Sequence, residues 1–421
     1  MLKHIFRCLS VLVVVSVMFS PVAPKTGPVS GNRSGVLSAE ASTGGLVSEQ
    51  SGFSIFMPTI MRGYPEKFLG VAVPLKADIP WDSDMDAFIS QTGKAHGVYH
   101  VSSGFACPWV DTVPKIRPFL DHAHARGAIM LIAWLPFDCT GTVGNVAAVG
   151  LPDILNGNWD SYIMQWATDI GALGYPVMVR WGHEMNIPTY SWAGQHAFGS
   201  NGKTDYSNSA ALAAQGCTLT NCYGDPNLAD GPERYIAAYR HVHDLTAPRA
   251  PNIIWVWNAS SRNWPLATDQ AWNSYNNYYP GDAYVDWIGL DMYNFGPKSG
   301  NGFSWTWASF DYMFADALND LAQRHPTKLQ MIPEIASVED PYGDPNRKAN
   351  WICDAYRSAM YNYPLLRMVS WQNEVIWDGA YSPTGNPGNV TGGGADFTVN
   401  SSPQALAAYQ QAIANWSSEA P

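Results

Sequence analysis

The sequence predicts an α/β fold, a (β/α)8 or TIM barrel, on three observations. Short apolar runs of strand length alternate with amphipathic, helix-like runs along most of the chain. Hydrophobic residues make up 46% and charged residues 14% of the 421 positions, which is enough apolar material for one large core. Two of the strand-like runs end on a glutamate, and functional groups of this fold lie at the carboxyl ends of its strands.

Residues 1–26 are predicted to be a secretory signal peptide. Lys3 and Arg7 precede the apolar stretch 9–19, which is too short for a membrane-spanning helix of about 20 residues. An uncleaved membrane anchor is the alternative, because no clear Ala-x-Ala cleavage site follows. Both interpretations put the folded domain outside the cytoplasm, and we expect a secreted protein with no stable membrane association once the signal is removed.

Residues 27–60 are rich in Ser and Gly and are predicted to be a flexible lead-in, followed by the barrel over residues 61–416. The predicted strands cover residues 68–73, 97–101, 129–134 and 177–179, with four more near Ile253, Val285, Met331 and Met368. The predicted helices cover residues 84–91, 113–126, 159–173, 232–245, 309–323, 347–361 and 403–415. The connection over residues 262–282 is irregular and carries no predicted helix.

The cysteines are compatible with export. One of the six lies in the predicted signal, which leaves an odd number in the rest of the chain. Cys217 and Cys222 lie in one polar loop, and Cys107 and Cys139 each follow a predicted strand at the same end of the barrel, so we predict the disulfides Cys107–Cys139 and Cys217–Cys222. Cys353, in a helix pattern, is predicted to be a buried free thiol. No cysteine or histidine cluster has the spacing of a metal site, and no cofactor is predicted.

The charge balance narrows the class of partner. A net charge of −11 argues against nucleic acid, and a neutral polymer fits better. The 18 Trp and 21 Tyr exceed what a core needs, and some of these rings could stack on the apolar faces of sugars, although most should be core. We therefore expect a polysaccharide partner.

Two strand-like runs deliver carboxylates to one end of the predicted barrel. The run over 177–179 is followed by Arg180, His183 and Glu184, and a second run ends on Glu334, 334 − 184 = 150 residues later. Two carboxylates at the ends of two strands suggest a paired acid/base and nucleophile. The alternative is that each glutamate only ends a strand or pairs with a lysine.

These residues resemble a known family. The pattern Arg-x-x-His-Glu-x-Asn, over residues 180–186, resembles the acid/base strand of glycoside hydrolase family 26, which contains β-mannanases, some mixed-linkage glucanases and β-1,3-xylanases. Residues 252–258, 285–293, 333–335 and 370–371 are similar to the family's fifth to eighth strands. The resemblance covers most of the chain from about Phe68 onward.

The resemblance implies roles that the residues alone leave open. It implies that Glu184 is the acid/base and Glu334 the nucleophile, whereas the sequence pattern gives the pair without assigning either. Arg180 lies four residues before Glu184 on the same strand face, so its guanidinium could hold the nucleophile ionised, or it could be a structural ion-pair partner. In the family, a tyrosine at the position of Tyr293 donates a hydrogen bond to the nucleophile.

Further site residues are carried by the same resemblance. It implies that His183 hydrogen-bonds the sugar in the cleaved subsite, and a core histidine is the alternative. A zinc-binding role is excluded, because Ile187 stands where the zinc-binding motif needs a second histidine. It implies that Trp371 is the platform under the cleaved sugar. Asp291 could tune the acid, contact substrate or end a strand. Four weaker platform candidates, each favouring packing over sugar binding, are Trp192, Trp257, Trp305 and Trp307.

Two departures from the mannanase pattern bear on the substrate. The residues after Asn186 begin with Ile187 where many family mannanases continue Gly-x-Trp, and Leu135 stands where they often carry histidine. We predict a secreted, metal-independent, retaining endo-β-glycanase, with β-1,4-mannan as the first candidate and mixed-linkage β-1,3-1,4-glucan or β-1,3-xylan as alternatives. A catalytically silent carbohydrate-binding barrel is disfavoured because both glutamates are present. We expect a monomer, since such barrels need no partner to complete the site.

Overall fold

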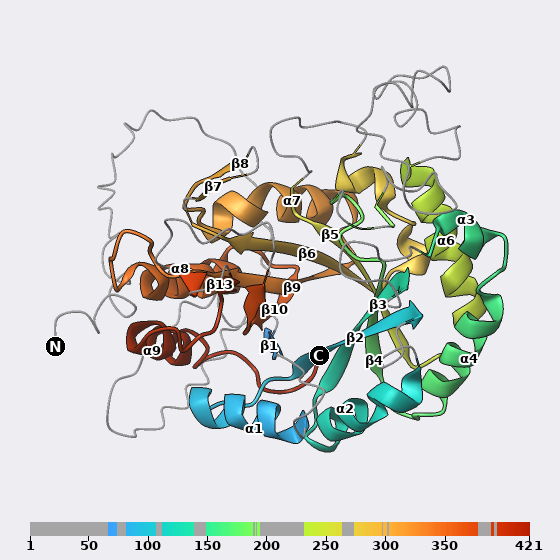
Figure 1. Cartoon of the computed structure of the whole chain (residues 1–421), viewed down its shortest axis with the longest axis horizontal. Coiled ribbons are helices and arrows are strands. Elements are labelled where there is room, and N and C mark those ends of the chain that lie inside the picture. The colour runs from blue at the N-terminus through green and yellow to red at the C-terminus, as the bar shows by residue number, and fades with distance from the viewer. Residues whose placement is uncertain are drawn as a thin grey trace, which may run out of the picture. The chain divides into compact units, whose positions relative to one another are not determined.

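Eight parallel strands close into a barrel, as the sequence predicts, in the order β1-β10-β9-β6-β5-β4-β3-β2 (Figure 1). In this computed structural model the described residues are 66–73, 81–106, 112–138, 149–187, 190, 192–193, 231–262, 273–296, 298–300, 303–377, 389–390 and 394–421. Residues Pro65–Pro421 form one compact unit. The predicted signal over 1–26 and the lead-in over 27–60 lie outside the described residues.

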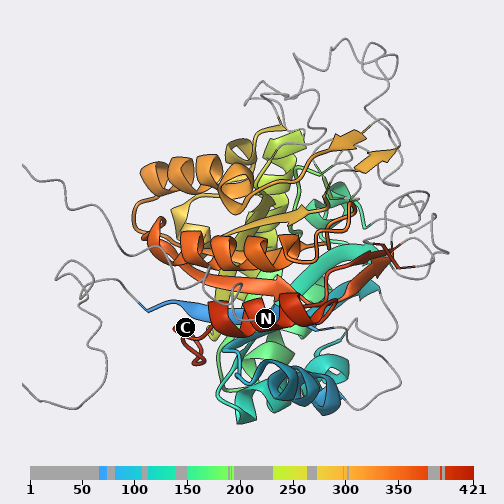
Figure 2. The ribbon, with the colours of Figure 1, turned by 90° about the vertical axis from the view of Figure 1, so that its left-hand side faces the viewer.

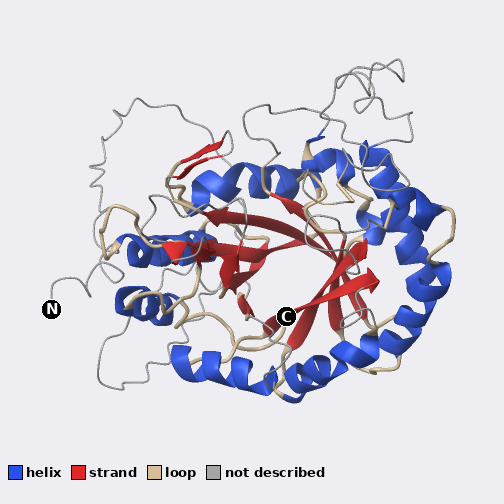
Figure 3. Cartoon of the chain, viewed as in Figure 1, coloured by secondary structure: helices blue, strands red, loops and turns tan. Residues whose placement is uncertain are grey.

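The barrel strands alternate with helices that surround them (Figure 3). The strands are β1 (Phe68–Ala72), β2 (Val98–Ala106), β3 (Ile129–Asp138), β4 (Val177–Trp181), β5 (Ile253–Ser260), β6 (Trp287–Asn294), β9 (Leu329–Ser337) and β10 (Leu366–Gln372). The helices are α1 (Trp81–Thr92), α2 (Val113–Ala125), α3 (Leu151–Leu155), α4 (Asp160–Gly171), α6 (Gly231–Thr246), α7 (Phe310–Arg324), α8 (Arg347–Tyr361) and α9 (Pro403–Ala412). Each predicted barrel strand and helix is confirmed within a few residues.

Short elements on the barrel's periphery were not predicted. The connection between β5 and β6 contains two 3-10 helices, η5 (Tyr275–Tyr278) and η6 (Asp282–Tyr284). Antiparallel pairing joins β7 (Lys298–Gly300) to β8 (Phe303–Trp305), and joins β11 (Val375–Trp377) and β12 (Asn389–Val390) to β13 (Gly394–Asp396). Strands of two or three residues are too short to display a period of two, which explains why the sequence pattern missed them.

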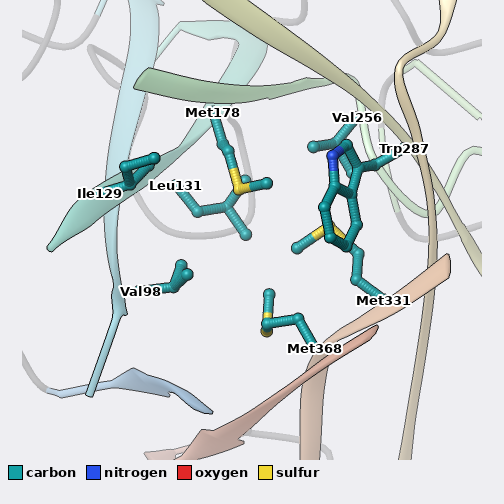
Figure 4. Close-up of a cluster of buried hydrophobic side chains, with 8 residues drawn as sticks. All are labelled: Val98, Ile129, Leu131, Met178, Val256, Trp287, Met331 and Met368. Atoms are coloured by element: carbon teal, nitrogen blue, oxygen red, sulfur yellow. The ribbon is translucent and has the colours of Figure 1, made fainter. Parts of the chain in front are cut away.

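An apolar layer fills the amino-terminal end of the barrel. Alternate residues of a strand point to the same face, so every second residue of a barrel strand faces the barrel axis. The inward side chains that meet there are Val98, Ile129, Leu131, Met178, Val256, Trp287, Met331 and Met368 (Figure 4). Ala420 packs against this layer from the C-terminal tail, and Ser417 accepts and donates backbone hydrogen bonds with β1 and its flank. The opposite end of the barrel is therefore left for polar side chains.

One cysteine prediction is wrong. Cys353 is buried in α8, as expected, but in the structure it is disulfide-bonded and is not a free thiol. An apolar helix position accommodates a half-cystine as readily as a thiol, so the helix pattern could not separate the two states. The predicted pairs Cys107–Cys139 and Cys217–Cys222 fall on cysteines outside the described residues.

Candidate active site

The chain turns sharply where β4 ends. Gly182 and Glu184 both have left-handed backbone conformations, with φ of 52° and 53°. For a residue with a side chain this conformation costs on the order of 1 kcal/mol, so the surroundings must hold it. They do so through two backbone hydrogen bonds, from Glu184 N to Asn258 O at 2.8 Å and from Ile187 N to Glu184 O at 2.9 Å.

Asn186 ties the same turn to the end of β5. Its side chain is fully buried, donates to Ser260 O at 3.0 Å and accepts from Ser260 N at 2.9 Å. The backbone oxygen of Asn186 in turn accepts a hydrogen bond from the amide of Asn273 at 2.9 Å. The position of Glu184 is thus fixed by contacts to β5 and to the segment that follows it.

Arg180 links three strands in the polar layer of the barrel. Its side chain is 4% exposed, and it donates to Asn258 Oδ1 at 2.9 Å and to Asp291 Oδ2 at 3.0 Å. Its second terminal nitrogen pairs with Glu334 Oε1. The expectation that Arg180 points toward Glu334 is therefore confirmed. Burial lowers the pKa of the guanidinium, but the charges of Glu334 and Asp291 outweigh burial and raise it, so Arg180 stays charged.

Close approach of strands in this layer depends on glycine. A Cβ at Gly289 in β6 would lie 3.0 Å from both Asn258 Cβ and Pro333 Cγ. A side chain at this position would displace Asn258, which is one of the partners of Arg180. The absence of a side chain at Gly289 therefore lets β5 and β9 bring Asn258 and Glu334 to the same guanidinium.

Glu334 is held ionised. Its two carboxylate oxygens accept hydrogen bonds from Arg180 and from the hydroxyl of Tyr293, the interaction that the family resemblance implied. Burial alone would raise the pKa of Glu334, but the positive charge of Arg180 dominates and lowers it to about 2. The ring of Tyr293 is fixed in turn by stacking on Phe397, with centroids 5.1 Å apart.

Glu184 has the opposite protonation behaviour. It is 6% exposed, and burial together with the negative charge of Glu334 raises its pKa to about 7. A hydrogen bond from the hydroxyl of Tyr190 to Glu184 Oε2, at 2.9 Å, and the charge of Arg180 limit this rise. At neutral pH and below, Glu184 therefore carries a proton for much of the time while Glu334 does not.

Asp291 is a fully buried carboxyl beneath the pair. It accepts from Arg180 and also from the backbone N–H of Glu334 at 2.9 Å, so it positions both residues. Burial and the charge of Glu334 raise its pKa, against the pull of Arg180. Asp291 and Glu334 pair directly with Arg180, whereas Glu184 is influenced only by its charge, and Glu334 is the carboxyl group whose pKa falls.

Two buried histidines lie near this centre and are neutral. Burial, followed by the charge of Arg180, lowers the pKa of His183 to about 3, and the same causes lower that of His100 to about 3. The Nε2 of His100 forms a hydrogen bond with Ser370 Oγ at 2.8 Å. Both imidazoles can therefore give or accept hydrogen bonds without adding charge to the site.

The arrangement can place a proton and a negative charge on opposite members of a carboxyl pair. Glu184, with a pKa of about 7, follows the end of β4, and Glu334, with a pKa of about 2, lies in the carboxyl-terminal half of β9. Such a pair can donate a proton from one member and attack with the other. In the part of the chain that the structure describes, no group of three or more His, Cys, Asp or Glu is placed to hold a metal ion.

Comparisons with known proteins agree on one family. The sequence model described as Glycosyl hydrolase family 26 matches residues 152–309. Endoglucanase H of Acetivibrio thermocellus is 31% identical over 340 residues, which are 80% of this chain and 30% of that protein. The chain belongs to glycosyl hydrolase family 26. It spans less than a third of the length of Endoglucanase H.

Solved structures of the family are also similar to this chain. A β-mannanase from a symbiotic protist of the termite Reticulitermes speratus, complexed with gluco-manno-oligosaccharide, has a TM-score of 0.47 at 12% identity, over 84% of this chain and 88% of that one. The family 26 domain of an endo-β-mannanase/endo-β-glucanase from Prevotella bryantii has a TM-score of 0.45 at 18% identity, over 74% of this chain and 85% of that one.

The structure overturns one site prediction for this family 26 chain. Trp371, expected as a sugar platform, is fully buried, with its ring against Trp351 of α8 and Tyr409 of α9. Its indole N–H donates to Phe397 O at 2.8 Å. Because Met368 and Ser370 face the barrel interior, the alternation of β10 turns Trp371 outward to the helices. It is a core residue and cannot stack on substrate in this structure.

Trp192 contacts two residues of the site, His183 and Tyr190. It is 3% exposed, donates its indole N–H to His183 O at 2.6 Å, and stacks on Tyr190 with centroids 4.6 Å apart. It therefore orients Tyr190, the residue that hydrogen-bonds Glu184. Trp257, another weak platform candidate, is fully buried and donates to Tyr278 O, so it is also a packing residue.

Sequence reasoning missed two residues that touch the site. Tyr190 donates to Glu184, and Asn258 accepts from Arg180 while its backbone oxygen anchors Glu184. Asn258 carried a usable signal, because it is a buried polar residue at the end of an apolar strand. Tyr190 lies in a loop and carried none beyond its position six residues after the acid.

Proposed function

We propose that this chain is a retaining endo-β-glycanase that hydrolyses an uncharged β-linked polysaccharide. The observation that carries the proposal is the pKa separation of two buried glutamates, raised to about 7 for Glu184 and lowered to about 2 for Glu334. Retaining hydrolysis needs one protonated carboxylic acid and one ionised carboxylate flanking the scissile bond. Between these two pKa values both requirements are met at once.

The reaction then proceeds in two displacements. Glu184 gives its proton to the glycosidic oxygen while the carboxylate of Glu334 attacks the anomeric carbon, so the bond to the leaving sugar breaks as a glycosyl ester forms. Glu184, now a carboxylate, takes a proton from water, which attacks the same carbon and frees Glu334. Each displacement inverts the carbon, so its configuration is retained overall.

The neighbouring residues support these roles. Arg180 and Tyr293 hydrogen-bond the two oxygens of Glu334 and keep it ionised and oriented for attack. His183 is neutral and adjacent to the acid, which suits a hydrogen bond to a sugar hydroxyl. Asp291 is a positioning residue, because it accepts hydrogen bonds from the guanidinium of Arg180 and from the backbone N–H of Glu334.

For the polymer, we place a mixed-linkage β-glucan ahead of β-1,4-mannan. Family resemblance alone put mannan first, but Leu135 and Ile187 depart from the mannanase pattern at positions that line sugar subsites in the family. The relative at 31% identity is named an endoglucanase. Because the chain spans 30% of that protein, the name supports the glucan and does not assign it. β-1,3-Xylan is the third candidate.

The predicted cell biology forms part of the proposal. A polysaccharide is too large to enter a cell intact, so its hydrolase has to be exported, which agrees with the signal pattern over 1–26. Within the described residues, no helix is long and apolar enough to cross a membrane. We propose that the mature enzyme acts as a monomer.

A polymer panel tests the proposal. The mature protein is incubated separately with barley β-glucan, linear β-mannan, glucomannan and β-1,3-xylan, and reducing ends and product lengths are followed, with Glu184→Gln and Glu334→Gln as inactive controls. Oligosaccharides of several lengths from β-glucan would support the glucan, and the same products from linear mannan would replace it with mannan. Binding of a polymer without any cleavage would overturn the enzyme proposal in favour of a carbohydrate-binding barrel.

A further inference from the structure

A pocket lies outside the ring of barrel strands, apart from the glutamate pair. It has a volume of about 330 Å³ and is lined by Trp307, Ser309, Phe310, Asp311, Asp344, Arg347, Asn350, Trp351, Asp354 and Ser358. Four of these residues come from the start of α7 and the segment before it, and the other six come from the segment before α8 and from α8 itself as far as Ser358. The two helices lie side by side (Figure 2). The amino termini of α7 and α8 lie at the end of the barrel that holds the glutamate pair, so the pocket begins at that end and extends along α8.

The aromatic wall of this pocket is fixed in place. The guanidinium of Arg347 lies 4.3 Å from the ring centroid of Trp307 and is anchored by Asp340 at 2.6 Å. On another side, a Cβ at Gly296 would come within 3.6 Å of the same ring. Trp351 donates its indole N–H to Ala308 O at 2.7 Å. The wall is therefore rigid before any ligand arrives, which lowers the entropy cost of binding.

The polar groups of the pocket favour a neutral ligand with many hydroxyls. Asp344 and Asp354 are exposed and each has a single hydrogen bond to one oxygen, from Asn346 N and from Arg357, so lone pairs remain. Carboxylates outnumber Arg347 in the lining, which disfavours anions. The described residues contain no group of three or more metal-ligating side chains, so a bound metal ion is disfavoured as well. Asn350 can both donate and accept.

An exposed aromatic residue precedes Asp344, one of the lining residues, in the chain. Tyr342 is 78% exposed in a tight turn, two residues before Asp344. Asp340 holds the turn with two hydrogen bonds. Its backbone oxygen accepts from Gly343 N at 3.2 Å, and its carboxylate Oδ2 accepts from Asp344 N at 2.9 Å. Gly343 has a φ of +87°, which only glycine adopts readily. A rigid turn that presents a tyrosine to solvent offers a stacking face for the C–H side of a sugar ring.

We propose that this pocket, together with Tyr342 in the turn that leads to Asp344, is a second saccharide-binding site, separate from the glutamate pair, for a sugar unit of an uncharged polysaccharide. The identity of the ligand rests on the proposed function, whereas the existence of the site rests on the pocket. Binding at a second point raises the effective concentration of the polymer near the cleft. Its contribution should therefore be larger for polymer than for a short oligosaccharide.

Binding is tested without hydrolysis, in the Glu334→Gln background. Retardation in native gels containing barley β-glucan or glucomannan gives the affinity for each polymer. Tyr342→Ala and the double variant Asn350→Ala, Asp354→Ala should each weaken retention by about threefold to tenfold, the scale of losing one of two linked contacts. Tyr361→Ala, an exposed tyrosine at the last residue of α8 that does not line the pocket, is the matched control and should match its parent. Equal retention of pocket variants and parent on both polymers would overturn the inference.

Measurements of hydrolysis distinguish a failure of the second saccharide-binding site from a failure of the proposed function. In the active background, the pocket variants should lose at least threefold more kcat/KM on the polymer than on a tetrasaccharide of the same linkage. An equal loss on both substrates would overturn the second site. If the parent hydrolyses no polymer but its retention still depends on Tyr342 and Asn350, the proposed function fails and the second site stands.

Discussion

Replacing Tyr190 with phenylalanine should move the alkaline limb of the pH–rate profile upward. The hydroxyl of Tyr190 donates to Glu184 Oε2 at 2.9 Å, and this bond favours the ionised carboxylate. Without the hydroxyl the carboxylate loses a donor, so the pKa of Glu184 rises above its value of about 7. Because Glu184 must be protonated to act, the variant should stay active at higher pH than the wild type.

The size of this shift follows from hydrogen-bond energetics. A bond to a charged acceptor contributes about 1.5–3 kcal/mol and one to a neutral acceptor about 0.5–1.5 kcal/mol, so the differential is about 1 kcal/mol. At about 1.36 kcal/mol for each pKa unit, the limb should move up by about 0.7 unit. One pH unit above the wild-type midpoint, the fraction of protonated Glu184 should then rise about three- to fourfold.

The assay is kcat/KM on the preferred polymer between pH 4 and 10, normalised to each protein's maximum. Phenylalanine keeps the ring that stacks on Trp192, so the loop should remain in place. Tyr175→Phe is the matched control, since its hydroxyl donates to Asp121 at 2.6 Å, away from the glutamates, and it should leave the limb unchanged. An alkaline limb that stays fixed or moves down in Tyr190→Phe would refute the assignment of that limb to Glu184.

Three further substitutions test other parts of the account. Arg180→Met should lower the free energy of unfolding in urea by about 3–5 kcal/mol, because it leaves the buried Asp291 without its charge partner; a loss below 1 kcal/mol would contradict this. Trp371→Phe should lower it by about 1–2 kcal/mol through the lost indole hydrogen bond while KM stays the same, and a tenfold rise in KM would restore the platform role. Gly289→Ala should lower both kcat and the thermal unfolding midpoint, with a destabilisation of about 1–3 kcal/mol, because its Cβ would collide with Asn258; wild-type values for both would show that this layer is loosely packed.

The residues that sequence could place are those that a strand period fixes. Arg180 lies in β4 and Glu334 in β9, so the parallel strands of the barrel bring them together. Glu184 lies beyond the end of β4 in a left-handed turn, which the strand period did not predict. The same period could have corrected Trp371. Counting by two from Met368, which belongs to the apolar layer, puts Trp371 on the outer face of β10.

Contacts made by loops could not be predicted in this way. The hydrogen bond from Tyr190 to Glu184 depends on a turn with no periodic pattern and on stacking against Trp192. The pocket outside the barrel joins the start of α7 to α8, about 40 residues later, and only the packing of the two helices reveals it. The state of Cys353 was equally hidden, because burial is common to thiols and disulfides.

Chemical rescue tests the division of labour between the glutamates most directly. Glu334→Ala is incubated with a dinitrophenyl β-glycoside of the preferred disaccharide, with and without azide, and the anomeric configuration of the product is read by NMR. Azide fills the space left by the nucleophile, so it should restore activity and give the α-glycosyl azide, inverted relative to substrate. Glu184→Ala, treated in the same way, should give the β-glycosyl azide, since Glu334 still forms the intermediate. Rescue of Glu334→Ala with retained configuration, or the same anomer from both variants, would contradict the assignment of Glu334 as nucleophile and Glu184 as acid/base.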